Sequence, residues 1–418
     1  MVVEFSTQYQ LDESKEVNMQ FKRNLLVCGI VSAFSLPVLA STDELRQALD
    51  QSKVNTNFRY RIESVDQDNL SKDALASTLR SRLSVQTGAY SGFSAFVELD
   101  NVTVLGDDSY NSTVNGETAY PVVADPDGSD LNQAFLRYQT ASKQTNVDMG
   151  RQRINLLNQR FLGSVGWRQN EQTLDGFRIQ HTTATWLVDA SRLHNVNRVF
   201  GPDGAKADEP GEFVNLLVGF KPNAQHQISV FAHDYQFDNW AARSSLTTGL
   251  DYLGNFVPAN QQQLQLHLAY ATQTDNSDSV SDFSEDYSRI DVLWKINKVS
   301  LEAGYELLSG DGTTALQTPL ATLHAFNGFA DIFLATPVNG LNDVWFGAGY
   351  TLPKGAINLQ YHQYSSDLND IDYGDEINLN YIYNISTRLM ANIKLAQYNR
   401  DQFAQDTQKI WVGLQLAL

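Results

Sequence analysis

Arginine and amide side chains crowd one stretch of the sequence. Residues 150–180 read GRQRINLLNQRFLGSVGWRQNEQTLDGFRIQ, which places arginine at positions 151, 153, 160, 168 and 178 among glutamines, asparagines and apolar residues. Guanidinium groups bind carboxylates and phosphates through paired hydrogen bonds, and amides hydrogen-bond other polar groups. Burying so many polar side chains without partners would be costly. The stretch therefore predicts a wet surface that can hold an anion.

Further charges recur at every second position of several segments. A β-strand turns successive side chains to opposite faces, so residues two apart share a face. The basic residues on such polar faces are Arg59, Arg61, Arg80, Arg82, Arg137, Arg178, Arg289, Lys295 and Lys394. The acids that would oppose them are Glu98, Asp100, Asp291, Glu302 and Glu306. Basic rings favour anionic solutes and opposing acids orient polar ones; the alternative is that these charges pair across neighbouring strands.

Catalytic and metal-binding motifs are missing from the sequence. It has no GxSxG or HExxH motif and no Cys/His cluster, and its seven histidines are scattered. His267 and His362 fall on polar faces, where a single histidine is more often part of the lining than a catalytic base. DPDGSD, residues 125–130, has carboxylate spacing like that of a calcium loop but lacks the later glutamate, so it is interpreted as an ordinary acidic turn. No enzyme activity, cofactor or metal is predicted.

The elements that carry these residues alternate with period two. QQQLQLHLAY, for example, places leucines and a tyrosine on one face and glutamine and histidine on the other. About eighteen such segments occur, near 55–64, 77–87, 92–102, 131–140, 145–153, 173–181, 184–192, 212–221, 225–235, 244–252, 262–273, 286–297, 299–308, 343–351, 355–364, 375–384, 388–398 and 407–418. Short turns alternate with long polar loops at 103–130, 154–172, 193–211 and 308–342. This pattern predicts an all-β transmembrane antiparallel barrel with short periplasmic turns and long extracellular loops.

A soluble β-sandwich is the alternative fold, because its strands also alternate. The ten-residue regularity and the aromatic residues at the ends of the apolar face favour a membrane barrel. A charge on the lipid side would cost ~2–4 kcal/mol near the midplane, so the barrel prediction places the charged face in the lumen. The last strand alternates correctly but ends in Leu418 rather than in the aromatic residue common in outer-membrane proteins.

The N-terminus predicts export. Lys22 and Arg23 precede the apolar run from Leu25 to Ala40, which fits a signal peptide over residues 1–40 cleaved after Ala40, with residues 1–18 as an upstream mis-start. Residues 41–54 are then a short periplasmic segment and 55–418 the barrel. The only cysteine, Cys28, lies inside the signal. The formal net charge of −18 argues against nucleic-acid binding.

Several motifs together resemble the alginate export family of outer-membrane porins. They are the 150–180 stretch, FRYRIESVDQD, STLRSRLSVQTG, DPDGSDLNQAFLRY and LSGDGTTALQTPLATLHAFNGFADIFLATPVNGLND. The resemblance implies an eighteen-stranded, monomeric barrel and a conduit for an anionic polysaccharide with an arginine-rich pore. Carried over to matching positions, it points to pore residues Arg151, Gln152, Arg153, Arg160, Arg168, Gln169, Asn170 and Gln172.

These observations support a porin or exporter in the outer membrane of a Gram-negative bacterium. It would contact lipid and lipopolysaccharide and pass hydrophilic, anionic solutes such as uronate oligosaccharides or organic acids. The 308–342 loop either gates the pore or packs on neighbouring loops. The alternative function is a plugged structural or adhesive barrel whose acidic loops bind divalent cations or surface sugars.

Overall fold

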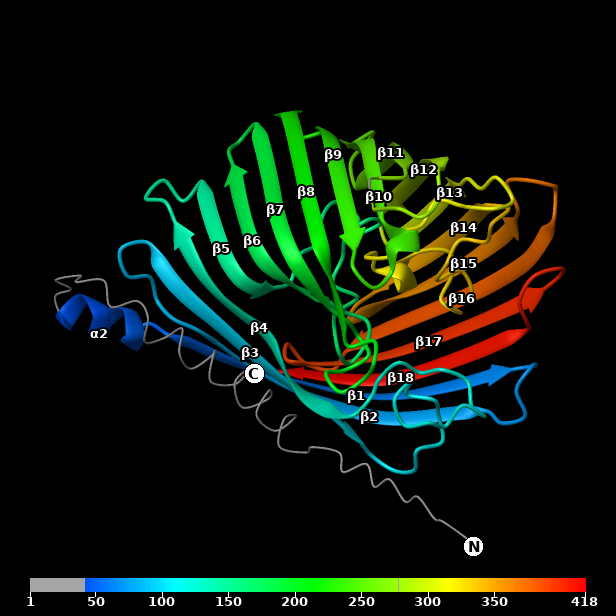
Figure 1. The fold of residues 1–418 in the computed structure, drawn as a ribbon, viewed down its shortest axis with the longest axis horizontal. Coiled ribbons are helices and arrows are strands. Elements are labelled where there is room, and N and C mark those ends of the chain that lie inside the picture. Colours follow the sequence, from blue (N-terminus) through cyan, green and yellow to red (C-terminus); the bar gives the residue numbers. More distant parts are fainter. Residues whose placement is uncertain (1–41, 277) are drawn as a thin grey trace, which may run out of the picture.

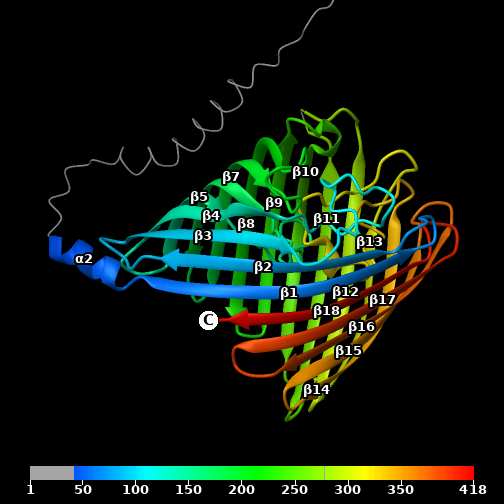
Figure 2. The same ribbon diagram turned by 90° about the horizontal axis from the view of Figure 1, so that it is seen from below.

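Eighteen antiparallel strands close into one barrel (Figures 1 and 2). The computed structural model describes residues 42–276 and 278–418. Helix α2 (Thr42–Asp50) precedes the strands, and two short 3-10 helices, η1 (Ala241–Arg243) and η2 (Leu323–Ala325), lie in loops. The strands are β1 (Lys53–Gln67), β2 (Ala74–Gln86), β3 (Phe93–Val104), β4 (Gly128–Gln139), β5 (Thr145–Gln152), β6 (Thr173–Thr182), β7 (Trp186–Asn197), β8 (Asp208–Asn223), β9 (His226–Phe237), β10 (Ser245–Phe256), β11 (Gln262–Thr274), β12 (Ser284–Ile296), β13 (Val299–Leu308), β14 (Leu341–Leu352), β15 (Gly355–Ser365), β16 (Asp372–Asn384), β17 (Leu389–Arg400) and β18 (Thr407–Ala417).

Strand β1 closes the barrel because it pairs with both β2 and β18. Each of the eighteen segments expected from the sequence coincides with one strand, so the predicted fold class is confirmed. The first strand begins at Lys53, slightly before the expected position 55. The predicted signal peptide lies outside the described residues and stays a prediction. No helix in the described ranges 42–276 and 278–418 is long and apolar enough to cross a membrane.

The connections differ in length at the two ends of the barrel. Eight short turns, which we call the periplasmic turns, span 87–92, 140–144, 183–185, 224–225, 257–261, 297–298, 353–354 and 385–388. The outer loops at the other end span 68–73, 105–127, 153–172, 198–207, 238–244, 275–283, 309–340, 366–371 and 401–406. Three of the four predicted long loops are confirmed. The fourth, expected at 193–211, is shorter because β7 and β8 extend into it.

The outer surface of the strands is apolar. Along β10 and β11, outward-facing Leu250 and Tyr270 are 48% and 50% exposed, whereas inward-facing Asp251 and His267 are buried. The same alternation runs around the barrel and places aromatic residues such as Trp186, Trp294 and Tyr350 on the outside. Such a surface is stable in lipid, because strand closure leaves no unpaired backbone in the hydrocarbon layer.

Two long outer loops fold into the barrel. In the 153–172 loop, Phe161 packs against Phe231 of β9 and Tyr287 of β12, with ring centroids 5.2 and 5.3 Å away. In the 309–340 loop, Phe333 packs against Tyr364 of β15 at 4.6 Å and against Phe403 at 5.5 Å. The predicted packing on neighbouring loops is confirmed, because the second loop contacts the 153–172 and 401–406 loops as well as the inner wall. Its role as a gate stays a prediction.

We expect the two faces of one strand to respond differently to a new charge. Leu359 of β15 faces outward and is 51% exposed, and its neighbour Gln360 faces inward and donates to Glu302. Leu359→Arg should destabilise the barrel by ~2–4 kcal/mol, as a cation in lipid does, whereas Gln360→Arg should cost much less beside that carboxylate. Denaturant unfolding in lipid vesicles measures both, and equal losses would contradict the assignment of faces.

Candidate functional site

Two arginines on neighbouring strands have no direct carboxylate partner, and we call them the uncompensated pair, although Asp125, Glu171 and Asp100 lie near enough to interact with them electrostatically. Arg59 of β1 lies opposite Arg80 of β2 in the strand register. The Arg59 guanidinium donates to Gln169 Oε1 at 3.0 Å and to the Gly166 carbonyl at 2.9 Å, and Arg80 donates to Asn57 Oδ1 at 2.8 Å. Among the described residues, neither arginine forms an ion pair with a carboxylate. Two cations thus lie side by side with only neutral hydrogen-bond partners.

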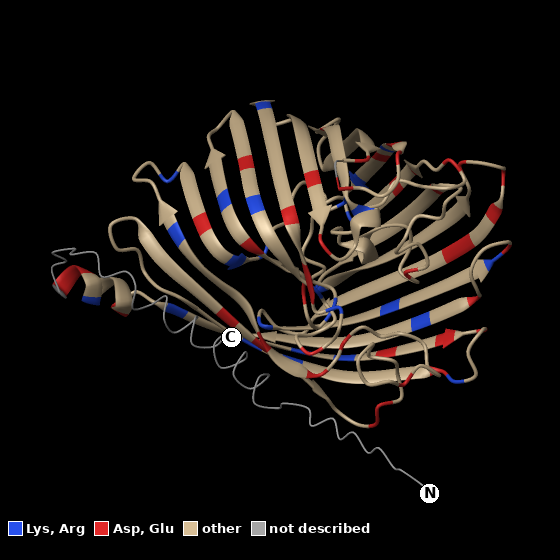
Figure 3. Cartoon of the chain, viewed as in Figure 1, with Lys and Arg blue, Asp and Glu red and all other residues tan. Residues whose placement is uncertain are grey.

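The surrounding arginines are paired with acids. Arg82 donates to Asp100 at 2.6 Å, and Arg153 donates to Glu171 at 2.6 Å and to Glu98 at 3.1 Å. Two further cross-strand pairs are Arg137–Asp148 and Arg178–Asp189. Basic and acidic residues therefore lie next to one another on the wall (Figure 3). Glu98 and Asp100 neutralise adjacent arginines rather than facing them across the lumen.

Asp125 joins the 105–127 loop to the wall and to the 153–172 loop. Its carboxylate contacts the Arg61 guanidinium of β1, accepts the Gln169 backbone N–H at 2.7 Å and lies 3.7 Å from Arg168. Burial alone would raise the pKa of Asp125, but Arg61, Arg168 and this N–H hold it below its ordinary value. The expected ordinary acidic turn at 125–130 is therefore wrong, because its first residue is a buried anchor.

A second cluster anchors the tip of the 309–340 loop. Glu306 of β13 accepts from Asn327 at 2.8 Å and lies 3.3 Å from Arg160 and 3.4 Å from Arg289. Asn327 also donates to Asp343 of β14 at 3.1 Å. Arg160 comes from the 153–172 loop, so this cluster binds both inserted loops to the wall. Arg289 also donates to Asp291 at 2.6 Å.

His324 and Asp331 form a third anchor. The Lys394 ammonium of β17 can only donate, so His324 Nε2, 2.5 Å away, accepts, and Nδ1 donates to Asp331 at 2.8 Å. Asp331 also lies 3.4 Å from both Arg168 and Lys409. Burial and the nearby Lys394 lower the pKa of His324 to about 3, although Asp331 opposes the shift. Burial would raise the pKa of Asp331, but His324 and Lys409 hold it well below its ordinary value.

The remaining predicted residues have varied positions. Gln172 is buried and donates to the carbonyls of Gly163 and Leu320, and Gln169 is buried between β1 and β2. Gln152 is buried, Asn170 and Glu302 are partly exposed, and Lys295 is exposed at the end of β12. The buried amides bind protein groups in this structure. Their predicted role toward a solute stays a prediction.

Arg151 differs from the expectation. It shares a strand face with Met149, which is 64% exposed on the outside of β5. Its guanidinium donates to Asp175 of β6 at 2.9 Å and lies 3.7 Å from Asp130. β5 ends one residue later, at Gln152, where the chain turns inward. The strand register therefore places Arg151 on the outer surface rather than in the lumen. The family motif runs across the end of this short strand, so it did not show on which face Arg151 lies.

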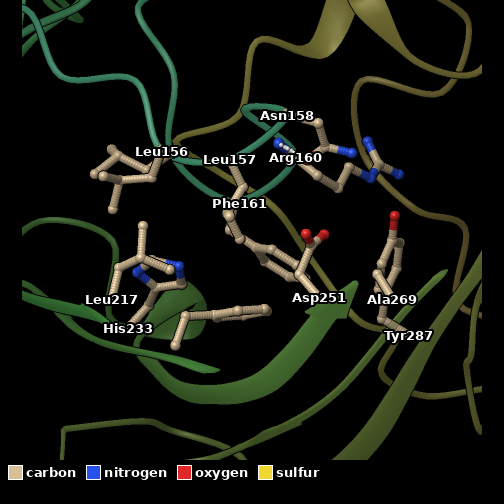
Figure 4. A pocket seen from close by; sticks show the side chains of 12 residues that line it. Leu156, Leu157, Asn158, Arg160, Phe161, Leu217, His233, Asp251, Ala269 and Tyr287 are labelled. Atoms are coloured by element: carbon tan, nitrogen blue, oxygen red, sulfur yellow. Dashed lines mark hydrogen bonds between the residues drawn. The ribbon is translucent and has the colours of Figure 1, made fainter. Parts of the chain in front are cut away.

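The apolar side of the 153–172 loop leaves little space. Figure 4 shows Phe161 extending toward His233, Asp251 and Tyr287 of the inner wall. The gap there has a volume of about 10 Å³, room for about one water molecule. This contact holds the loop in place and offers no ligand site.

Two larger cavities border the 309–340 loop. An outer cavity of about 480 Å³ is lined by Arg168, Arg198, His324, Asp331 and Lys409 together with apolar loop residues. An inner cavity of about 220 Å³ is lined by Phe326, Phe329, Arg289, Glu302 and Trp345, among others. Residues 324–331 contribute to both cavities. This segment therefore lines both cavities, and the anchors described above hold it in place.

Comparison of the sequence with known families shows to which family the chain belongs. Residues 50–358 match the alginate export family. The chain belongs to the alginate export family. The match spans β1 to β14 and the start of β15, so the arginine-rich wall and both inserted loops lie within the matched region.

Solved outer-membrane barrels share the fold of this chain. OccK9 (OpdG) of Pseudomonas aeruginosa has a TM-score of 0.71 at 14% identity, covering 89% of this chain and 100% of that chain. OccAB4 of Acinetobacter baumannii has a TM-score of 0.70 at 12% identity, covering 88% and 98%. The outer membrane protein opdK of P. aeruginosa has a TM-score of 0.69 at 13% identity, covering 88% and 99%. Comparison with curated proteins gave no match. Family and fold together identify an outer-membrane β-barrel.

We expect acid to loosen the 309–340 loop. His324 has a pKa of about 3 when the loop is docked, and an undocked histidine returns to ~6.5. Between these values only the undocked loop binds the extra proton, so docking is stable above pH ~6.5 and weakens as the pH falls toward 3. Hydrogen exchange of the loop measures this. His324→Asn should flatten the dependence between pH ~4 and ~6.5, above the range in which the aspartates protonate. An unchanged slope in that range would contradict the assignment.

Proposed function

We propose that this protein is a porin that gives anionic, hydrophilic solutes a passage across the outer membrane. The observation that carries the proposal is the Arg59–Arg80 pair, which has no acid partner among the described residues. In a narrow lumen, fixed cations raise the local concentration of anions and exclude cations. The paired arginines contribute much less, because their carboxylates offset them.

The solutes are small organic acids or extended uronate oligosaccharides. The inserted loops leave cavities of about 220 and 480 Å³ in the described structure, which suit an extended chain or a small molecule rather than a folded one. Carboxylates match the guanidinium groups, and sugar hydroxyls match the amides of residues 150–180. Membership of the alginate export family supports the uronate class.

Passage requires no bond chemistry, so the protein is proposed to be a channel and not an enzyme. Selectivity arises from the width of the lumen, the inserted loops and the uncompensated cations. The barrel is proposed to work as a monomer, with its apolar belt in lipid and its outer loops at the lipopolysaccharide layer.

A plugged structural or adhesive barrel is the second candidate. The observation that favours it is the depth to which both loops are anchored: Phe161, Phe333 and the ion pairs of Asp331 all fix them to the wall. Single-channel recording in planar bilayers separates the two functions. Discrete openings support the porin, and a permanently silent barrel would overturn it.

Removing the uncompensated pair should reduce anion preference. We expect Arg59→Gln combined with Arg80→Gln to shift the reversal potential under a salt gradient toward cation preference, with a several-fold lower anion-to-cation permeability ratio. Glutamine can still donate to Gln169 and Asn57, which limits structural damage. Cation preference in the unaltered protein would refute the anion proposal even if the channel is open.

Arg192→Gln is the matched control. Arg192 pairs with Glu212 at 2.9 Å, and its side chain is 73% exposed on the outer surface. Its removal should leave the reversal potential unchanged. A shift as large as that of the double variant would show that total charge, and not the position of the cations, sets the preference.

A further inference from the structure

A groove opens on the lipid-facing side of the wall formed by β1 to β4, which lie side by side in the barrel (Figure 2). It has a volume of about 550 Å³, within the ~300–1,000 Å³ of sites that hold small molecules. Two rows of residues, each running across the four strands, line it. Arg82 and Asp100 lie between the rows in the register, but their side chains face inward and pair with each other.

One row supplies an apolar surface. It consists of Thr56, Leu83, Leu99 and Leu131. Leu83 and Leu99 are exposed on the outside of the barrel, where the hydrocarbon chains of lipid take the place of water. This row therefore suits the methylene groups of an acyl chain.

The second row carries polar groups on the same outward face. It consists of Phe58, Ser81, Asn101 and Ser129. Asn101 accepts from the Thr103 hydroxyl at 2.9 Å and donates to Ser129 Oγ at 2.9 Å. The Ser81 hydroxyl has no side-chain hydrogen bond to any residue in the ranges 42–276 and 278–418. Part of this row therefore lacks a partner.

Lipid chains cannot satisfy these hydroxyls as water would. Ser81 lies between Leu79 and Leu83 on the outward face of β2, and an apolar surrounding disfavours a hydroxyl without a hydrogen bond. Ser129 accepts from Asn101, so it still has its own proton to donate. An occupant that suits both rows needs oxygen atoms beside its hydrocarbon.

We propose that the groove binds a β-hydroxyacyl chain of a lipopolysaccharide-type lipid. Its hydrocarbon packs on the leucine row, its hydroxyl bonds Ser81, and its carbonyl accepts from Ser129. The two serines are two strands apart, ~10 Å at the ~4.8 Å spacing of strands. A hydroxyl and a carbonyl on nearby carbons of one chain, with a hydrogen bond at each end, span about this distance.

The place of the groove in the barrel agrees with such a lipid. Ser129 lies at the start of β4, directly after the outer loop 105–127, so the polar row reaches the outer side of the belt. Phe58 and Ser81 are the chain neighbours of Arg59 and Arg80. The bound lipid therefore packs on the back of the wall that carries the uncompensated pair.

The test is retention of two matched probe lipids. The barrel is reconstituted in phosphatidylcholine vesicles with equal amounts of two phosphorylated diglucosamine lipids, one with β-hydroxymyristoyl chains and one with myristoyl chains. Native mass spectrometry of the extracted barrel counts each bound lipid. Because the head groups are identical, only the hydroxyl distinguishes them. We expect several-fold more of the hydroxylated lipid. Equal retention of the two, or retention of neither, would overturn the proposal.

Three variants locate the site. Ser81→Ala combined with Ser129→Ala removes the hydroxyls but leaves the groove open, so the preference should fall close to equality. Leu99→Trp fills the groove and should lower retention of both lipids. Thr248→Ala is the matched control, because it removes an exposed hydroxyl from β10, nearly opposite β2 in the strand order, and should leave the preference unchanged. An equal loss of preference in this control would overturn the groove as the site.

The inference goes beyond the proposed passage of anions and can fail separately from it, because lipid retention is measured without conductance. A barrel that conducts no anions but prefers the hydroxylated lipid refutes only the porin. A barrel that conducts anions but retains both lipids equally refutes only the lipid site.

Discussion

Closure of the sheet is the constraint on which the rest of the structure depends. Because lipid offers no hydrogen bonds to the backbone, β1 must pair with β18 as well as β2. Closure then gives every strand one face toward lipid and one face toward the interior. Apolar residues at every second position of a strand therefore decide which of its faces lies against lipid. Polar residues collect inside without any need for a conventional core, and the inner space becomes available for the loops.

The inserted loops fill interior space that closure of the barrel leaves empty. A barrel of eighteen strands encloses more space than its own side chains fill. The 153–172 and 309–340 loops occupy this space with aromatic contacts on one side and ion pairs on the other. Buried ion pairs contribute little net stability, because desolvation offsets their attraction. The aromatic contacts are therefore the main source of loop stability, and the charged anchors at Glu306 and Asp331 fix the position of each loop.

The sequence alone predicted the strands, whose pattern repeats along the chain, and it missed the ion pairs between residues that lie far apart in the chain. Period-two alternation placed all eighteen strands and put Arg59 and Arg80 on one face, since local spacing determines both. The anchors Asp125 and Asp331 were missed because each has partners far away in the chain, Arg61 for Asp125 and Lys409 for Asp331, and no local pattern distinguishes such an acid from one in a surface turn. Arg151 was misplaced because the family motif runs across the end of β5.

The uneven pairing of the arginines is the physical reason why anion preference is proposed for a protein with a net charge of −18. Most inner arginines have an acid within hydrogen-bond distance, so the field of each pair falls off quickly. The loop acids at the outer mouth lie in water, where salt screens them within about 10 Å. Arg59 and Arg80 instead lie inside the wall, where screening is weaker. In the proposed porin, a solute in the lumen would therefore respond to these two cations more than to the total charge, and their lack of a direct carboxylate partner is the basis of the proposed anion preference.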